Sequence, residues 1–261
     1  VDIAASRTLL RNAMKQSKAC IFIGQGFIGG APDGTTTTLG REGSDYSAAV
    51  AANILDAESM SVWKDVDGIL NADPKVFPDA VQIAELNYLD TIELAYSGAQ
   101  IIHPKTIKPL QNKNIPLYVR PFGDKRKPGT VIRRMSAPIE VPILILKKDQ
   151  VLLTIRSRDF SFVLEEKFAA IFSLLERYRI KVNLVHNSAV NLSLCVDNSW
   201  HIDEAIQALR NEEFDVMKVE NMELLTIRGY NGDLMERYAS GPEVFLLQRT
   251  QSTARIVRKN R

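Results

Sequence analysis

The sequence predicts an α/β protein, with a mostly parallel sheet in its first part and a smaller α+β arrangement in its last part. Strand-like and helix-like segments alternate over residues 1–134, which is typical of a sheet whose strands are joined by helices. From residue 150 on, the segments follow the order β-α-β-β-α-β, which is the ferredoxin-like pattern. This change in order predicts two separate folding units.

The composition is that of an ordinary globular protein. Of the 261 residues, 45% are hydrophobic and 25% are charged, and the formal net charge is +2. A charge this close to zero gives no electrostatic reason to expect a nucleic-acid or membrane partner. No apolar run approaches the ~18 residues that a membrane helix needs, so we expect a cytoplasmic protein. Cys20 and Cys195 lie in apolar runs without metal-ligand or disulfide spacing, which predicts two buried thiols and no resident metal site.

The first part is punctuated by glycines and prolines. The apolar run at 18–30 stops at glycines, as a buried parallel strand does where its C-terminal end enters a loop. That loop runs to Gly43, and Ser44 after it is a suitable N-cap for a helix. Further strands are expected at 59–65 and 115–121. Helices are expected at 2–17, 45–57, 88–98 and after Pro104.

The second part begins after a proline-containing stretch at 133–142 that has no hydrophobic period and is interpreted as a linker. We expect a linker and an edge strand at 135–149 and one complete β-α-β-β-α-β copy at 150–220. A partial copy at 221–261 lacks its last helix and strand. The strand at 142–148 is a candidate for the missing sheet edge, in which case one copy is nested inside the other.

One stretch of the first part, "GTTTTLGREGSDY" at 34–46, concentrates hydroxyl and backbone amide groups directly before a helix. Free amides, threonine hydroxyls and the positive end of the helix dipole suit a bound anion. Arg41 can hold a carboxylate or phosphate through two parallel hydrogen bonds. Asp45, in the first helical turn, can hold an ammonium group or orient a lysine. The stretch matches neither of the usual glycine-rich nucleotide motifs, so an ordinary surface turn is an equal alternative on these residues alone.

Four blocks of the first part resemble aspartokinase, the enzyme that phosphorylates the side-chain carboxylate of aspartate. The blocks are "QGFIGGAPDGTTTTLGREGSDYSAAVAA", "VWKDVDGILNADPKV", "SGAQIIHPKTIKPL" and "GTVI", and they occur in the order of that family. The part after residue 140 resembles the paired ACT domains of the same family. The resemblance implies an amino-acid-kinase-type sheet with helices on both faces, followed by ferredoxin-like ACT domains.

The resemblance also implies an activity: ATP, with Mg²⁺, phosphorylates L-aspartate to 4-phospho-L-aspartate, the first step toward lysine, threonine and methionine. Arg41 would bind the substrate α-carboxylate, and Ser44 and Asp45 would complete the aspartate site. Thr36, Thr37 and Thr38 would face the transferring phosphoryl group. Asp45, Thr37 and Thr38 are therefore the predicted catalytic residues.

The second and third blocks would hold ATP. The resemblance places Lys64 and Asp65 near the ribose and phosphates, Leu70 beside the base and Lys75 on phosphate, while Gln100 and Ile101 would line the adenine pocket. The chain departs from the family pattern at several of these positions: threonine is often found where this chain has Lys64, tyrosine where it has Leu70, arginine where it has Lys75 and lysine where it has Gln100. His103, before Pro104, is interpreted as structural, and Trp63 as core packing.

The ACT resemblance implies an amino-acid effector and a homodimer through these domains. Lysine and threonine are the candidate effectors. Their contacts would come from two regions, 158–167 and 182–190, which supply the candidates Phe160, Ser161, Asn183, Asn187 and Ser188. Asn183 and Ala189 stand where acidic groups would hold a lysine ammonium, so a lysine effector would lose its strongest partners.

The family opens its kinase domain with a Lys-Phe-Gly-Gly strand and loop that this sequence does not contain. We therefore expect residues 1–134 to be the C-terminal part of the kinase domain, and this chain to be inactive alone. A non-catalytic subunit that binds an amino acid and assembles with a longer chain is the alternative. Arg41, Asp45 and the threonine stretch favour the catalytic interpretation, because a regulatory subunit has no use for them.

Overall fold

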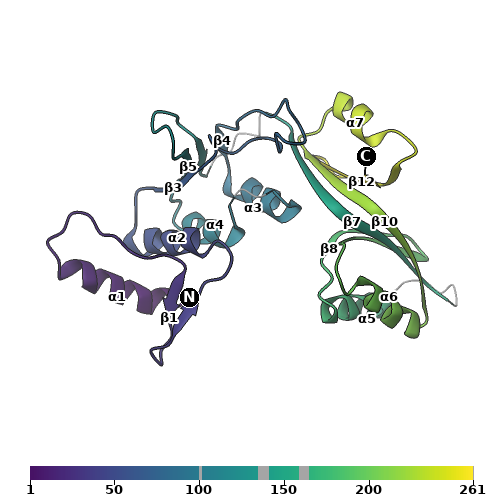
Figure 1. Ribbon diagram of the computed structural model, residues 1–261, viewed down its shortest axis with the longest axis horizontal. Coiled ribbons are helices and arrows are strands. Elements are labelled where there is room, and N and C mark those ends of the chain that lie inside the picture. Colours follow the sequence, from purple (N-terminus) through teal and green to yellow (C-terminus); the bar gives the residue numbers. More distant parts are fainter. Residues whose placement is uncertain (100–101, 135–140, 159–164, 261) are drawn as a thin grey trace. The chain divides into compact units, whose positions relative to one another are not determined.

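The computed structural model describes residues 1–99, 102–134, 141–158 and 165–260 (Figure 1). The chain divides into two compact units, Val1–Val141 and Pro142–Arg261. Each unit has its own sheet and is considered by itself. Within the described parts of the chain, no helix is both long and apolar enough to cross a bilayer.

The first unit is built on a four-stranded sheet with the order β3-β5-β6-β4. β3 (Met60–Lys64) is parallel to β5 (Leu117–Pro121), and β4 (Glu85–Leu86) is parallel to β6 (Thr130–Ile132). β5 and β6 are antiparallel to each other, so the sheet is mixed, with parallel pairing at both ends. The strands predicted at 59–65 and 115–121 are confirmed as β3 and β5.

Three helices, α2 (Gly43–Leu55), α3 (Tyr88–Ser97) and α4 (Pro104–Gln111), lie on one side of this sheet (Figure 1). They bury an aliphatic core that includes Ile54, Leu94, Leu110 and Leu117. Along β3 the alternate residues Ser61 and Trp63 are exposed, because strand side chains alternate between the two faces. Trp63, predicted as core, is 42% exposed, with the Arg120 guanidinium carbon 5.9 Å from its ring centroid.

The predicted bounds of α3 and the predicted start of α4 are confirmed by local chemistry. α3 begins where the Asn87 side chain accepts the Asp90 backbone N–H, and it ends at Gly98, whose φ of 115° few other residues adopt. α4 begins at Pro104, and the His103 imidazole accepts the Lys105 N–H at 3.1 Å. This capping bond confirms the structural interpretation of His103. α1 (Ile3–Lys15) is also helical, although none of its residues is fully buried.

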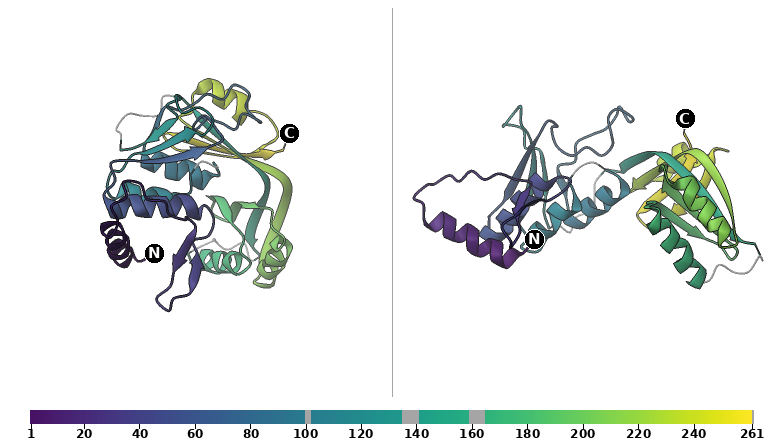
Figure 2. Two further views of the ribbon diagram at one scale, coloured as in Figure 1. Left: turned by 60° about the vertical axis from the view of Figure 1, so that its left-hand side comes forward. Right: turned by 60° about the horizontal axis from the view of Figure 1, so that its bottom comes forward.

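The prediction of a buried parallel strand at 18–30 is wrong. Residues 20–27 form no strand, and Ile21 and Ile23 are 82% and 98% exposed. The short strands β1 (Ile28–Gly30) and β2 (Thr36–Thr38) instead form an antiparallel hairpin that projects from the unit (Figure 2). The physical reason is the lack of a neighbour, because β3 pairs with β5 on one side only and no described strand pairs with the apolar run. Cys20 is therefore exposed, contrary to the prediction, whereas Cys195 is buried as predicted.

The second unit is a curled six-stranded antiparallel sheet with the order β11-β12-β10-β7-β9-β8 (Figure 1). Its two longest strands, β7 (Ile143–Ser157) and β10 (Phe214–Arg228), pair along most of their length. The strands β8 and β9 form a hairpin, as do β11 and β12. The remaining bounds are α5 (Glu165–Arg177), β8 (Val182–Asn187), β9 (Asn191–Asp197), α6 (Ile202–Asn211), α7 (Gly232–Ala239), β11 (Val244–Arg249) and β12 (Thr253–Lys259).

The two long strands confirm the nested arrangement. The first half of β7, Ile143–Lys147, pairs with Leu224–Arg228, while Gln150–Arg156 pairs with β9. The segment 142–148 thus supplies the sheet edge of the partial copy, with the complete copy inserted behind it. Asp149 and Asn221, with φ of 54° and 57°, lie at the irregular midpoints of β7 and β10.

Apolar residues cover both faces of this sheet. On one face, α5 and α6 lie side by side and bury Leu153, Leu194 and Leu209 (Figure 2). On the other face Leu152, Cys195 and Met222 form a second buried cluster. Successive residues of β7 therefore enter different cores, as the period of a strand requires.

Candidate functional site

The base of the β1–β2 hairpin is tied to the first turns of α2. The Phe27 backbone N–H donates to Ser47 Oγ at 3.0 Å, and Ser47 Oγ donates to the Gly43 carbonyl at 2.9 Å. A side chain at Gly43 would bring a Cβ within 2.8 Å of the Phe27 ring, so this close approach requires glycine. The glycines of the segment therefore bring the threonine hairpin close to a helix N-terminus.

The residues predicted to bind aspartate and to face the phosphoryl group lie in this region, but their local structure differs from the prediction. Thr36, Thr37 and Thr38 form the exposed strand β2, not an irregular loop, and Arg41 is exposed. The prediction of Ser44 as N-cap is wrong, because α2 begins at Gly43 and its N-cap is Glu42, in the left-handed region with φ of 55°. Ser44 is exposed in the first helical turn.

Glu42 has a second role that sequence reasoning missed. Its Oε2 accepts the backbone N–H of His103 at 2.7 Å, which joins the start of α2 to the start of α4. The carboxylate is thereby drawn away from its own helix, and the structure gives it no side-chain capping bond. A charged residue directly before a helix is no signal for such a long-range contact, so only the fold could identify it.

The centre of the candidate site is an ion pair between Asp45 and Lys64. Lys64 Nζ lies 2.8 Å from Asp45 Oδ2, and the two side chains are 32% and 19% exposed. Asp45 is in the first turn of α2, where the helix dipole favours a carboxylate. Lys64 is the last residue of β3, the strand that follows α2 in the chain. The pair thus joins the block predicted to bind aspartate to the block predicted to bind ATP.

The other predicted nucleotide residues lie along the segment that follows β3. Asp65 and Lys75 are exposed, and the Lys75 backbone N–H donates to Asp73 Oδ1 at 2.9 Å. Leu70 is half-buried and forms an isolated antiparallel bridge with Gln82. Among the described residues, no hydrogen bond or ion pair joins the side chains of these three residues to that of Lys64. Gln100 and Ile101 lie outside the described residues.

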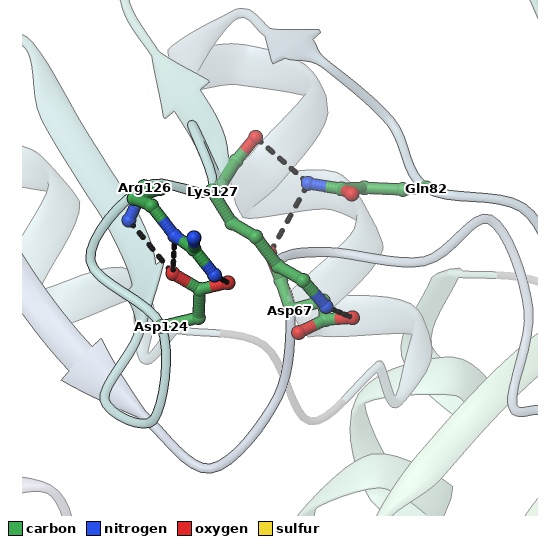
Figure 3. Close-up of polar contacts among 6 residues, drawn as sticks. Asp67, Gln82, Asp124, Arg126 and Lys127 are labelled. Carbon is green, nitrogen blue, oxygen red and sulfur yellow. Dashed lines mark hydrogen bonds and ion pairs between the residues drawn. The ribbon is translucent and has the colours of Figure 1, made fainter.

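Two loops beside this segment are held together by contacts that the sequence did not single out (Figure 3). Gln82 Nε2 donates to the backbone carbonyls of Asp67 at 3.1 Å and Gly129 at 2.8 Å. Lys127 Nζ lies 2.6 Å from Asp67 Oδ2, which adds an ion pair between the same loops. A side chain at Gly129 would place a Cβ 2.0 Å from the Val119 carbonyl oxygen, so the glycine of the "GTVI" block was the available signal.

A second polar cluster lies in the other unit, around the carboxylate of Asp197. Its Oδ1 is 2.6 Å from Lys147 Nζ, and it accepts Gln150 Nε2 at 3.0 Å and Asn183 Nδ2 at 2.7 Å. Burial works to raise the pKa of Asp197, but these hydrogen bonds outweigh it and hold the pKa below its ordinary value. Gln150 is only 1% exposed, so this cluster is built into the sheet.

The predicted effector residues lie in different surroundings in the structure. Asn183 belongs to the Asp197 cluster, where its Oδ1 accepts Lys147 Nζ at 2.9 Å and its amide group donates twice. Asn187 is the last residue of β8 and is exposed, while Ser188 closes the β8–β9 turn by accepting the Asn191 N–H at 3.2 Å. Phe160 and Ser161 lie outside the described residues.

Comparisons with known proteins agree with this architecture. Residues 2–121 match the model of the amino acid kinase family. Lysine-sensitive aspartokinase 3 of Escherichia coli is 35% identical over 233 residues, covering 86% of this chain and 51% of that protein. This chain belongs to the aspartokinase family. Aspartokinase 1 of Arabidopsis thaliana, a chloroplastic protein, is 36% identical over 209 residues, covering 76% of this chain and 36% of the relative.

Solved aspartokinase structures share the fold. The E. coli aspartokinase III structure in complex with aspartate and ADP has a TM-score of 0.78 and 29% identity, covering 99% of this chain and 62% of that chain. The aspartate kinase of Clostridium acetobutylicum has a TM-score of 0.83 at 18% identity, which shows the fold alone. The α/β fold with a following α+β part is therefore confirmed. The chain spans about half the length of the E. coli relative, and a smaller share of the plant one.

Proposed function

We propose that this chain is part of an aspartokinase, which transfers the γ-phosphoryl group of ATP to the β-carboxylate of L-aspartate. The Asp45–Lys64 ion pair is the observation that carries the proposal, since it brings the predicted aspartate and ATP blocks into direct contact. Residues 1–134 would be the C-terminal part of the kinase domain, with ACT domains at 150–220 and 221–261. E. coli aspartokinase III, a homologue, has been solved with aspartate and ADP, which supports this pair of ligands.

The proposed reaction needs charge neutralisation more than acid–base chemistry. A carboxylate oxygen of aspartate attacks the γ-phosphorus, and the bond from that phosphorus to the β-phosphate bridging oxygen breaks to release ADP. The acceptor is already ionised, so no proton has to be removed and Asp45 is not required as a base. Both reactants are anions, and positioning and cationic groups provide most of the catalysis in phosphoryl transfer.

The charge of each residue in the proposed aspartate site decides which part of the substrates it would bind. Arg41 is exposed and free to hold the substrate α-carboxylate through its two-pronged guanidinium. Asp45 Oδ1 has no hydrogen-bond partner among the described residues, so this oxygen can accept the substrate ammonium while Oδ2 keeps Lys64. Ser44 and the β2 threonines add neutral donors. Thr37 and Thr38 face the phosphoryl group in this arrangement.

ATP would lie along the segment after β3, with Lys75 on phosphate, Leu70 beside the base and Gln100 and Ile101 around the adenine. Within the described ranges no three or more acidic, histidine or cysteine side chains gather as a metal site. Mg²⁺ fits this chain as an ion carried on the ATP phosphates, since it commonly keeps several waters and few protein ligands.

An amino-acid effector and a homodimer belong to the same proposal. The amide group of Asn183 is already committed to the Asp197 cluster, so Asn187 and Ser188, at the β8–β9 turn, are the described candidates with side chains near solvent. The E. coli homologue is described as lysine-sensitive. In this chain Ala189 provides no carboxylate for a lysine ammonium, and threonine remains the second candidate effector.

The test is aspartate-dependent release of ADP, with this chain compared to one extended upstream to include the remaining kinase segment. We expect no turnover by this chain, turnover by the extended chain, and a loss of about tenfold or more for Arg41→Ala in the extended chain, as expected when a charged hydrogen bond to substrate is lost. Arg11→Ala is the matched control, because Arg11 pairs with Asp56 at the other end of α2.

Aspartate-dependent turnover by the purified chain alone would show that the kinase site is complete here. An inactive extended chain that still binds lysine or threonine would replace the kinase proposal with the regulatory subunit, and the β2 threonines would then need another explanation.

A further inference from the structure

We infer that Lys64 is a catalytic residue that holds the transferring γ-phosphoryl group, with Asp45 fixing its ammonium in place. This inference rests on the proposed phosphoryl transfer and assigns it a specific cation. It goes beyond a general nucleotide contact near the ribose and phosphates, because it makes Lys64 discriminate between ATP and ADP.

The geometry of the pair supports this role. A lysine ammonium has three N–H donors, and the described residues provide Lys64 with one side-chain partner, Asp45 Oδ2 at 2.8 Å. The Lys64 side chain is 32% exposed, and no hydrogen bond from its ammonium to another described residue is found, which leaves two donors for a ligand. A phosphoryl oxygen can take them without breaking the bond to Asp45, and the ammonium would then lie between the donor phosphate and the acceptor side of the site.

The backbone fixes where this ammonium lies. Lys64 ends β3, and its carbonyl accepts the Phe122 N–H at 2.7 Å, which extends the pairing with the β5 side of the sheet. Asp45 is fixed independently by the first turn of α2. Ligands in α/β sheets bind outside the carboxyl ends of parallel strands, and the Lys64 side chain leaves β3 at that end.

A comparison with the other end of α2 shows why the pair is more than a surface contact. There, Lys113 and Arg11 both pair with Asp56, whose side chain is 56% exposed and whose pKa is lowered mainly by the hydrogen bond from Lys113. Asp56 lies after the helix, and two cations contact its carboxylate. Asp45 is only 19% exposed and has a single described cation, Lys64. That ammonium and the positive end of the α2 dipole both attract an incoming phosphate.

The experiment measures dissociation constants for MgATP and MgADP by calorimetry, with this chain and with its Lys64→Met, Lys64→Arg and Lys113→Met variants. We expect Lys64→Met to weaken MgATP by about tenfold or more, as for a charge-assisted hydrogen bond, and MgADP by far less. Lys64→Arg should keep most of the preference for ATP. Lys113→Met, which breaks the ion pair with Asp56 at the other end of α2, should leave both constants unchanged.

Turnover by the upstream-extended chain separates this inference from the proposed function. There, Lys64→Met should lower kcat and leave the KM for aspartate within about twofold, which indicates an interaction made in the transition state. A purely structural role would instead weaken ATP and ADP equally and lower the melting temperature.

An unchanged ratio of the MgATP and MgADP dissociation constants, whether both nucleotides are weakened equally or neither is, would overturn the inference, and so would no MgATP binding by the unaltered chain. In the first case aspartate-dependent turnover by the extended chain would leave the kinase proposal intact. Conversely, a Lys64-dependent ATP preference in an extended chain that does not phosphorylate aspartate would reject aspartate as the acceptor and keep Lys64 on the γ-phosphate.

Discussion

The two units treat apolar segments of their sequences in opposite ways. In the second unit the apolar segment 142–148 pairs with β10, and Ile143 is 2% exposed. In the first unit the equally apolar run at 20–27 finds no neighbour, and Ile23 is 98% exposed. The difference shows that an apolar sequence makes a strand only where another strand offers its hydrogen-bonding edge, since each unpaired backbone group is better left to water.

The largest expected effect is the loss of stability when a buried side chain of the second unit is truncated, compared with truncation of an exposed side chain of the first unit. Leu194→Ala removes a side chain that is 0% exposed between α5, α6 and the sheet, and should lower the free energy of unfolding of the second unit by about 2–5 kcal/mol. Ile23→Ala, at a position that is 98% exposed, should change the free energy of unfolding of the first unit by less than about 0.5 kcal/mol. Urea denaturation followed by circular dichroism measures both. A comparable loss from Ile23→Ala would mean that the 20–27 run is packed in solution.

A smaller effect is expected from the polar cluster at the midpoint of β7. Asp197→Asn leaves Lys147 without its carboxylate and should cost about 1–2 kcal/mol at pH 7, reduced by solvent because a third of the Asp197 side chain is exposed. The folded pKa of Asp197 lies below its ordinary value of 3.8, so its stabilisation is complete above that pH and is lost as the pH falls through the folded value.

The unaltered chain and the Asp197→Asn variant should therefore converge in stability on acidification, as measured by urea titrations between pH 7 and 2. Asp203→Asn is the control, since Asp203 is 79% exposed in its pair with Lys218. A constant difference between the unaltered chain and the Asp197 variant at all pH values would exclude a role for the ionised carboxylate.

The smallest perturbation is a test by thiol labelling, which requires no mutation. Burial raises the pKa of Cys195 to about 12, and the residue is 0% exposed, so a thiol reagent should not reach a thiolate there until the second unit unfolds. Cys20 is exposed and should react at once. Mass spectrometry of the labelled chain, with and without urea, counts the modified thiols. Native labelling of Cys195 would contradict the closed core, and protection of Cys20 would show that the 20–27 run has a partner.

The elements of the second unit could be predicted from the sequence because their patterns are local. The helices α6 and α7 and the β8–β9 hairpin follow from spacing within single segments. The joining of 142–148 and 151–157 into one strand could not be predicted in this way. Their connection through Asp149 in the left-handed region depends on β10, which is distant in the sequence.

The candidate site was predicted in its residue types but not in its contacts. Asp45 was expected to hold an ammonium group or to orient a lysine, and in the structure it pairs with Lys64. The N-cap assignment failed at Ser44, because Glu42 takes a left-handed conformation and its carboxylate accepts the amide of His103. Such contacts join segments that are far apart in the chain, so no local pattern reports them.

The nested strands also dictate an order of assembly. The segment Ile143–Lys147 is synthesised before the complete copy, yet its partner Leu224–Arg228 comes only after that copy has emerged. Closing the outer sheet therefore brings together ends that are separated by an entire inserted unit, and compaction of this insert first lowers the entropic cost of closure. Until the outer sheet closes, the hydrogen-bonding edge of Ile143–Lys147 has no partner. A nascent chain paused before residue 222 would carry a folded inner copy and an outer strand still accessible to chaperones.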